Sequence, residues 1–541
     1  MSAIQKMGTI ATALLTVCLF GGCDQGGGAK APTDTADLGP TIGSLANVLT
    51  PESEAVEGYG VVGGLNKTGS AECPPQIKAY LKRYIQKKLA SSGNPARLNI
   101  DKYISSLETS VVLVEGIIPA IPSKNQYFDV RVTALPGTQT TSLEGGVLMS
   151  TELKRPGSFG MSSAILADAE GPIFTDKINT TGTDPKIGYV LGGGKVLNEY
   201  RIVLALHKPD FRMSNRIRNR LNGRFGDNTA RAVLPDRVEV MVPVQYKNQK
   251  QRFVSMIKAM YLTQEPEATV ERIRTLVKRL ADSQEKYESE VGLETIGKQS
   301  LGGLNVLLNS DDERVRLHAA RSMLNLGSDA GLTALRQIAT DTTSHHRLEA
   351  LEAITVGAMR RDAASVARKL LRDDDFQITL AAYEHLRQLD DIAITQEFIG
   401  RNFYLEQTAQ SNHKVIYASR SGQPQIVLFG APLQCQSNIF MESADGKITI
   451  NTPAGRNYVT IMRKHPRRPG VVARLNSSFD LGDMIKTLCE EPPSEEDKDR
   501  RGLGVSYAEA IVLLKQMCDK GAVAAEFHTG DLPKIDLNIK K

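Results

Sequence analysis

The sequence contains Gly58-Tyr59-Gly60-Val61-Val62-Gly63-Gly64-Leu65-Asn66-Lys67-Thr68-Gly69-Ser70, and this glycine-rich stretch decides the fold prediction. The Lys67-Thr68 pair suggests a phosphate-binding loop, which requires glycine directly before the lysine and a second glycine five residues earlier. Asn66 and Val61 occupy these two positions, so the phosphate-binding interpretation fails. We therefore interpret the stretch as a strand and turn, in which glycine permits close packing and unusual backbone angles.

The sequence around this stretch predicts short strands mixed with helices. Runs of β-branched residues predict strands at 111–116, 127–135, 201–206 and 237–244. Apolar residues at every fourth position predict a helix over 77–89, and a second helix is expected at about 214–225. Residues 51–262 are therefore predicted to form one α+β unit.

The glycine-rich stretch and several later motifs occur in an order that resembles a known family. The opening signature rests on Gly58, Gly60, Gly63, Gly64, Asn66 and Gly69. It is followed by a strand and glycine turn at 128–137, a Leu-x-Gly-Gly strand at 142–149, and a strand-helix-strand unit at 206–243. Together these motifs resemble the flagellar basal-body P-ring protein family.

The same resemblance resumes near the C-terminus. Residues 481–488 and 506–515 are similar to the two closing helices of the family, and 520–527 is similar to its final Gly-Ala-x-x-Ala-Glu segment. The resemblance implies that residues 401–541 complete, as an α/β portion, the body that begins with residues 51–262.

Residues 263–400 separate these two parts and carry a recurring helical pattern. Val315–Ala320, His346–Leu351 and Ile378–Tyr383 are similar to one another at offsets of 31 and 32 residues. Acidic pairs at 311–312 and 374–375 precede the first and third copies, as expected at helix N-termini. Paired helices of this period resemble HEAT-like repeats, with a plain helical bundle as the alternative. The predicted fold is an α+β P-ring-type body interrupted by an all-α HEAT-like solenoid.

The charge of the chain is unevenly divided. The whole sequence has a net charge of +5, too small over this length to make nucleic acid the main partner. Residues 263–400 carry 17 Lys/Arg against 23 Asp/Glu, whereas the remaining residues carry 49 against 38. The acidic insert therefore either lies against a basic body or offers a docking surface to another protein.

One predicted helix carries a regular stripe of arginines: Arg212, Arg216, Arg220 and Arg224. Their spacing of four aligns them on one helix face, with Ile217 and Leu221 toward the core. This stripe is a candidate contact for acidic patches of a neighbouring subunit or for envelope polyanions, and a solvated basic face is the alternative.

The N-terminus predicts export. The apolar run from Met7 to Phe20 has the length of a signal-peptide core and is too short to cross a bilayer. The segment ending at Cys23 resembles a bacterial lipobox, so we expect a signal peptide over 1–22 and lipidation of Cys23, which would hold the protein at a membrane without a spanning helix. The alternative is an ordinary signal peptide with Cys23 as a stray thiol. Residues 23–50 are expected to form a flexible tether.

Four cysteines follow Cys23, at positions 73, 435, 489 and 518. Export permits disulfides, and Cys489 with Cys518 is the first candidate pair, with isolated buried thiols as the alternative. The sequence has no Cys-x-x-Cys motif and only eight histidines, so no metal site or cofactor is expected. It also lacks a Gly-x-Ser-x-Gly elbow and a His-Glu-x-x-His helix, so we do not expect an enzyme.

The resemblance implies a structural role. Proteins of the P-ring family assemble in many copies around the flagellar rod, in the periplasm at the peptidoglycan layer, as a passive bushing with the lipid-anchored outer ring. The expected partners are other copies of the chain, the rod, the outer-ring proteins and peptidoglycan, with an unknown protein on the repeats. The rival hypothesis is an envelope lipoprotein that uses the repeats as a binding scaffold outside any flagellum.

Overall fold

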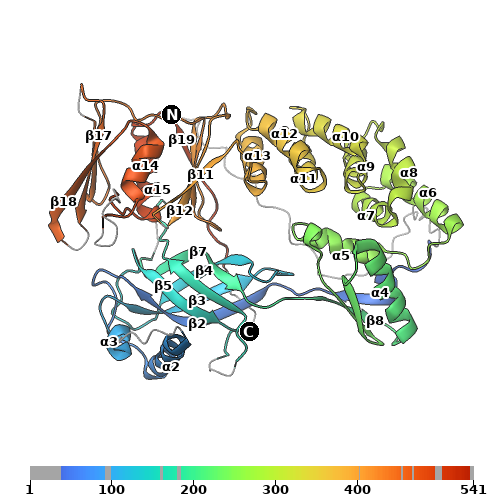
Figure 1. Cartoon of the computed structure of the whole chain (residues 1–541), viewed down its shortest axis with the longest axis horizontal. Coiled ribbons are helices and arrows are strands. Elements are labelled where there is room, and N and C mark those ends of the chain that lie inside the picture. The colour runs from blue at the N-terminus through green and yellow to red at the C-terminus, as the bar shows by residue number, and fades with distance from the viewer. Residues whose placement is uncertain are drawn as a thin grey trace, which may run out of the picture. The chain divides into compact units, whose positions relative to one another are not determined.

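The computed structural model describes residues 38–91, 99–158, 163–178, 184–400, 402–452, 455–465, 468–493 and 502–535. The predicted signal peptide and Cys23 lie outside these residues. Figure 1 shows a barrel, further sheets and a run of helices, which are taken below in the order in which they build the molecule.

The glycine-rich stretch forms one strand of a closed barrel. Its strands are β2 (Glu54–Gly63), β3 (Ser110–Ile118), β4 (Tyr127–Ala134), β5 (Val147–Leu153), β6 (Ala167–Pro172) and β7 (Ile187–Val196), and they close in the order β2-β3-β4-β7-β6-β5. Residues along β4 alternate between buried and less buried positions, with Val130 and Val132 fully buried. Helices α2 (Pro75–Ser91) and α3 (Ile100–Ile104) pack on the outside through Leu81 and Ile104.

A second sheet holds the arginine-bearing helix. Its strands, in spatial order, are β1 (Ala46–Leu49), β8 (Ile202–Leu206), β10 (Arg237–Val240) and β9 (Ala230–Leu234). Helices α4 (Phe211–Phe225) and α5 (Lys250–Ala259) bury their apolar faces in the core of this sheet, and the short η1 (Val244–Tyr246) precedes α5.

The predicted tether is wrong at its C-terminal end. Residues 42–45 form helix α1 (Ile42–Leu45), and β1 directly after it pairs antiparallel with β8. Ile42 is completely buried and Ala46 is 2% exposed, and the partly buried Leu45 and Val48 pack against the same core, so apolar side chains of both short elements anchor the segment. Each element is only four residues long, too short for a helix or strand pattern to be recognised in the sequence.

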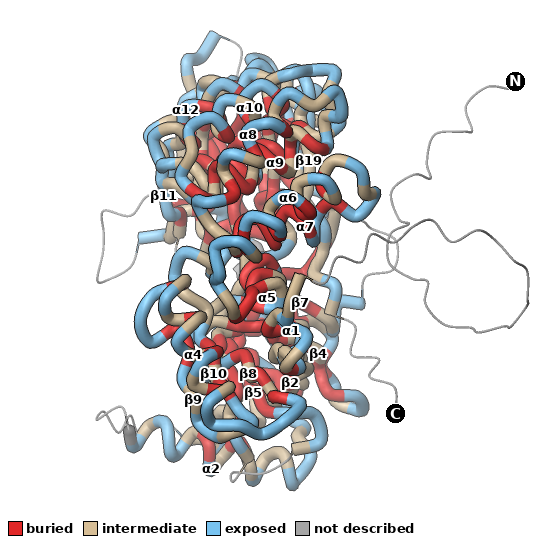
Figure 2. Tube along the Cα trace, turned by 90° about the vertical axis from the view of Figure 1, so that its right-hand side faces the viewer, coloured by how far each residue is buried: buried red, intermediate tan, exposed pale blue. Residues whose placement is uncertain are grey.

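The residues between the second sheet and the C-terminal part are helical. The helices are α6 (Pro266–Asp282), α7 (Lys286–Ile296), α8 (Leu301–Leu307), α9 (Glu313–Asn325), α10 (Asp329–Thr340), α11 (Arg347–Gly357), α12 (Arg360–Leu370) and α13 (Phe376–Gln388), with a short η2 (Lys298–Ser300) before α8. In Figure 2, α10 alternates between buried and exposed residues, as expected for a helix with one apolar face, whereas α9 is mostly buried or intermediate.

The three similar sequence copies fall on α9, α11 and α13, which contact one another in that order. Ala319, Ala350 and Ala382 occupy the same place in the three copies, and each is completely buried. The side chains of Asp312 and Asp375 cap α9 and α13 by accepting backbone hydrogen bonds, which confirms the predicted helix starts. The assignment of these helices as HEAT-like repeats stays a prediction.

The helices share their cores with the sheets on both sides. Val291 of α7 packs into the core of the second sheet. At the other end, the core of α9 to α13 includes Val415, Val427 and Phe429 from strands of the C-terminal part. The boundary predicted at residue 400 is wrong, because β11 (Thr395–Ile399) pairs along its whole length with β12 (Phe403–Thr408) of the C-terminal sheet.

The C-terminal part contains two sheets and two helices. The first sheet has the order β11-β12-β14-β13-β19, with β13 (Val415–Ala418), β14 (Gln425–Phe429) and β19 (Glu526–Thr529). The second has the order β15-β16-β17-β18, with β15 (Phe440–Glu442), β16 (Ile448–Asn451), β17 (Val459–His465) and β18 (Arg468–Ser477). Helices α14 (Leu481–Cys489) and α15 (Tyr507–Asp519), at the places predicted for the closing helices, supply much of the shared core.

The predicted Cys489–Cys518 disulfide is not formed. Cys73, Cys435, Cys489 and Cys518 are all free thiols in the structure. Cys489 ends α14 with 1% of its surface exposed, inside the apolar core, whereas Cys518 lies in the last turn of α15 and is only partly buried. Burial raises the pKa of Cys435 and of Cys518 to about 11, so these thiols remain protonated at neutral pH.

Candidate functional site

The signature glycines have a structural task in closing the barrel. A Cβ atom on Gly58 would lie 2.3 Å from the carbonyl oxygen of Glu152 in β5, and one on Gly60 would lie 2.3 Å from the hydroxyl of Thr151. A Cβ on Gly69, in the turn after β2, would lie 2.1 Å from the carbonyl oxygen of Thr109. The signature therefore allows β2 to lie between β3 and β5 without steric conflict.

The remaining signature residues lie at the end of β2 and in its turn. Gly63 is the last residue of the strand and is buried, while Asn66 is exposed in the turn. Gly64 has a φ of +79°, a conformation that residues with side chains rarely adopt. The structure thus brings the six signature residues together as one strand and turn.

The arginine stripe on α4 divides into an exposed half and an internal half. Arg212 and Arg216 are exposed. Arg220 donates a hydrogen bond of 3.1 Å from Nε to the carbonyl oxygen of Tyr261, and Arg224 donates one of 3.1 Å from Nη2 to the carbonyl oxygen of Glu294. Burial, together with the nearby charge of Arg224, lowers the pKa of Arg220. Only the first two arginines of the stripe are therefore free to meet a partner.

The face of α4 opposite the stripe packs as predicted. Ile217 and Leu221 are completely buried in the core of the second sheet. Asp210 caps the helix by accepting a 2.8 Å hydrogen bond from the backbone nitrogen of Arg212. The sheet therefore fixes the orientation in which the two exposed arginines are presented.

A buried ion network joins the second sheet to the helices. Glu290 of α7 is completely buried and accepts hydrogen bonds from Arg252 of α5 at 2.6 Å and from Arg321 of α9 at 2.6 Å and 2.5 Å. The Nδ1 atom of His318 lies 2.5 Å from the same carboxylate. Glu294, one turn further along α7, also binds Arg252 and accepts a 3.0 Å hydrogen bond from Asn325.

The network fixes the ionisation of Glu290. Burial alone would raise the pKa of this carboxyl group, but the charges and hydrogen bonds of Arg252, Arg321 and His318 outweigh it and hold the pKa well below its usual value. This site was not predicted from the sequence. The sequence signal for it is the pair Glu290 and Glu294, which lie four residues, or about one helical turn, apart.

Two polar contacts join the barrel to the C-terminal part. The carboxylate of Asp129 in β4 accepts hydrogen bonds from the backbone nitrogens of Gly192 at 2.6 Å and Gly422 at 2.9 Å. Arg420 forms an ion pair of 3.2 Å with Asp176, and both side chains are almost completely buried. These contacts connect residues far apart in the sequence, so spacing could not predict them.

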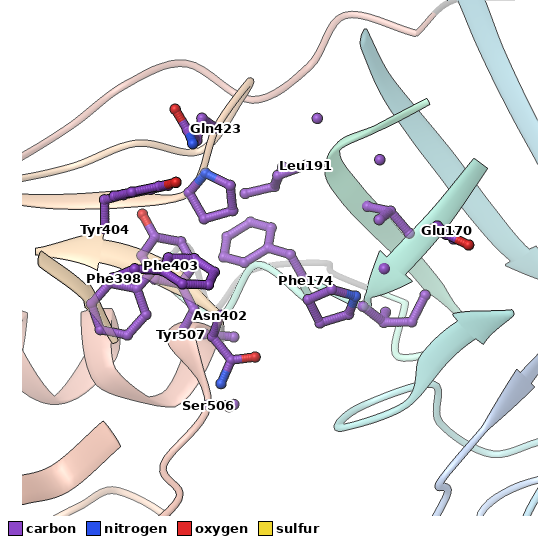
Figure 3. A pocket seen from close by; sticks show the side chains of 18 residues that line it. Glu170, Phe174, Leu191, Phe398, Asn402, Phe403, Tyr404, Gln423, Ser506 and Tyr507 are labelled. Carbon is purple, nitrogen blue, oxygen red and sulfur yellow. The ribbon is translucent and has the colours of Figure 1, made fainter. Parts of the chain in front are cut away.

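A cavity of about 260 Å³ lies beside these contacts (Figure 3). Phe174 and Leu191 line it from the barrel, and Phe398, Phe403 and Tyr507 line it from the C-terminal part. The hydroxyl of Tyr507 already donates a 2.6 Å hydrogen bond to the carbonyl oxygen of Ser419. Tyr404 is a fifth aromatic residue of the walls, which are largely apolar.

Neither a metal-binding cluster nor a membrane-spanning helix occurs among the described residues. Within the described ranges, no group of three or more His, Cys, Asp or Glu side chains is placed to hold a metal ion. Among the helices formed by those residues, none combines the length and the apolar character needed to cross a membrane.

Comparison with known proteins identifies relatives of the N-terminal part. Residues 41–277 match the family model described as flagellar P-ring protein. The flagellar P-ring protein of Hydrogenovibrio crunogenus is 30% identical over 240 residues, covering 41% of this chain and 61% of the relative. That of Geotalea uraniireducens is 28% identical over 240 residues, with the same coverage, and that of Campylobacter jejuni is 26% identical over 220 residues, covering 38% and 59%.

The matched residues correspond to defined parts of the fold. They include the second sheet and the whole barrel and end within α6. The chain spans about three-fifths of the length of the curated relatives it matches. The resemblance to the P-ring family therefore holds for the N-terminal half, and the similarity expected over 481–527 stays a prediction.

Proposed function

Because residues 41–277 match the P-ring family, we propose that this protein is a structural subunit of the flagellar basal-body P ring. In this role many copies assemble around the rod in the periplasm and form a passive bushing for rotation. The observation that carries the proposal is the extent of the match, which takes in the complete barrel and the complete second sheet. No turnover chemistry is required of such a subunit.

The internal contacts support a load-bearing role. Glu290 binds groups from α5 and α9, and Asp129 binds the barrel and the C-terminal part at once. Hydrogen bonds to charged groups are stronger and more directional than neutral ones, so each contact resists displacement of the parts it joins. A subunit that keeps its shape suits a ring whose inner wall faces a rotating rod.

The partners follow from this role as proposals. We infer that the chain contacts other copies of itself, the rod, the outer-ring proteins and peptidoglycan. The exposed Arg212 and Arg216 are candidates for one of these contacts. The helices α6 to α13 would serve as an additional docking surface for a further protein, as expected if they are HEAT-like repeats.

Basal-body purification tests the ring assignment. We expect the full-length protein to copurify with basal bodies, to be absent from that fraction in cells that lack the rod, and to be required for swimming. Cofractionation with bulk membrane alone, together with normal motility after deletion of the gene, would instead identify an envelope lipoprotein used as a binding scaffold.

Membrane anchoring by Cys23 is a separate proposal. Replacing Cys23 by serine removes the thiol that would accept the lipid. We expect the C23S protein to leave the membrane fraction after cell breakage, whereas the matched C73S protein remains there. Retention of C23S in the membrane fraction, measured by immunoblotting, would contradict lipid anchoring and leave the ring assignment unaffected.

A further inference from the structure

The hairpin of β17 and β18 ends in an exposed sheet edge. β18 is the last strand of its sheet and, within the described residues, pairs only with β17. Val471 and Val472 are adjacent in this strand and each is 51% exposed, so apolar side chains on both faces of the strand are uncovered. An edge strand of this kind presents unpaired backbone donors and acceptors to another strand.

The hairpin is also strongly basic. Residues 459–477 contain five Lys/Arg and no Asp or Glu, although one of the five, Arg463, is buried and paired with Glu509. Lys464 is 49% exposed and its ion pair with Glu442 is long, at 3.8 Å, while Arg474 is exposed. Pro469 lacks a backbone amide proton, so the edge that can pair continuously runs from Val471 to Asn476.

A second exposed edge on the same chain has complementary properties. β11 is the first strand of its sheet, and four of its five residues are exposed. Residues 390–400 contain Asp390, Asp391 and Glu397 and no Lys or Arg. Asp391 is paired with Arg368 and only 8% exposed, so the exposed acidic side chains are Asp390 and Glu397, the latter in a surface ion pair with Lys486. Phe398 in β11 is 51% exposed, and Ile392, three residues before the strand begins, is 92% exposed, so this edge also combines charge with uncovered apolar side chains.

We propose that β18 of one copy pairs with β11 of the next copy, so that two sheets continue across the subunit boundary. The inference rests on the proposed function, because a ring requires an interface in which two different surfaces of the same chain meet. Backbone hydrogen bonds would supply affinity, the valines would cover Ile392 or Phe398, and the opposite charges would fix which edges pair.

Cross-linking identifies the paired strands directly. A photo-reactive amino acid replaces Val472 in the full-length protein, and light and isotopically heavy chains are mixed before assembly. We expect cross-links between light and heavy chains that map to residues 390–399. Cross-links confined to one chain, or mapping to other residues of the neighbour, would overturn the inference.

Polar substitutions test whether the contact is needed for assembly. The variants V471S/V472S and I392S remove apolar groups that are exposed within one copy, and V306S on α8, where the side chain is 70% exposed, is the matched control. We expect each test variant to keep its melting temperature and to associate about tenfold more weakly in sedimentation velocity, equivalent to about 1.4 kcal/mol.

The outcomes separate the two proposals. If the unmodified protein forms rings and the test variants form them equally well, the strand pairing is wrong and the ring assignment stands. If the unmodified protein forms no ring even in cells that contain the rod, the proposed function is wrong, and this interface is wrong with it.

Discussion

At the scale of single residues, Glu290 of α7 is held by charged and polar partners on all of its hydrogen-bonding contacts. It is completely buried and lies against Arg252, Arg321 and His318. A buried carboxylate without partners would be strongly unfavourable, and so would the guanidinium groups left behind if it were removed. The ion pairs of Glu290 therefore add little net stability, but removing any one of their partners is expected to destabilise the protein strongly.

Neutralising Glu290 is predicted to destabilise the protein. The E290Q variant keeps the shape of the side chain but leaves two arginines less well compensated, and we expect a loss of about 3–5 kcal/mol in the free energy of unfolding. Urea unfolding followed by circular dichroism measures it. The exposed Glu288 on the same helix provides the matched control E288Q, which should change stability little. Equal stability of E290Q and E288Q would contradict the assigned network.

The same carboxylate predicts a dependence of stability on pH. Its pKa is lowered in the folded protein below the usual 4.5, so its ionised form favours folding above that pH. As the pH falls below about 4.5, the unfolded chain takes up the proton first, and this stability is lost. We expect unfolding midpoints measured between pH 6 and pH 3 to fall less steeply for E290Q than for the unmodified protein, with E288Q following the latter.

At the scale of secondary-structure elements, β2 shows why the signature needs glycine. The strand lies so close to β5 that a methyl group on Gly58 would meet the backbone of Glu152 at 2.3 Å. Backbone atoms in a closed barrel cannot move aside as a flexible side chain can. The spacing of the glycines therefore reflects the distance between strands.

Adding that methyl group is predicted to weaken the barrel. We expect G58A to lower the free energy of unfolding by about 1–3 kcal/mol, the usual cost of overpacking. Thermal unfolding measures the effect. Gly302 on α8 is the matched control, because a Cβ there meets nothing within 4 Å and alanine favours a helix. If G58A is as stable as G302A, close packing does not explain the signature.

Elements with a local pattern were predictable, and elements held by distant contacts were not. The repeat helices α9, α11 and α13 have their periodicity in the sequence itself, and α9 and α13 also have their acidic caps there. The boundary predicted at residue 400 placed β11 in the helical insert because no strand pattern was recognised before that residue, whereas its pairing with β12 places it in the next sheet. For the candidate site, the stripe of four arginines was visible as a sequence pattern. Which of them are exposed was not, because Arg220 and Arg224 are drawn inward by hydrogen bonds to Tyr261 and to α7.

At the scale of the whole molecule, the chain is held together by contacts between its first and last parts. Asp129 accepts hydrogen bonds from the barrel residue Gly192 and from Gly422 in the C-terminal part. Arg420 and Asp176 form a second, buried contact nearby. The helical insert is therefore enclosed between parts that also bind each other directly.

Removing the Asp129 carboxylate is predicted to loosen this junction locally. Hydrogen bonds to a charged group contribute about 1.5–3 kcal/mol each, so D129A should expose the amide of Gly422 to exchange at least about tenfold faster. Hydrogen-exchange mass spectrometry on the full-length protein measures it. The exposed Asp227 supplies the control D227A. Unchanged exchange at Gly422 in D129A would mean that other contacts alone hold the junction.

The separation of Asp129 from Gly422 along the chain also sets the interval between the synthesis of the two residues. The two residues are 293 positions apart in the chain, and a ribosome adds about 5–20 residues per second. Roughly 15–60 seconds therefore pass between the synthesis of the carboxylate and the synthesis of its distant partner. Throughout that interval the barrel residues exist without the backbone amide that Asp129 binds in the C-terminal part.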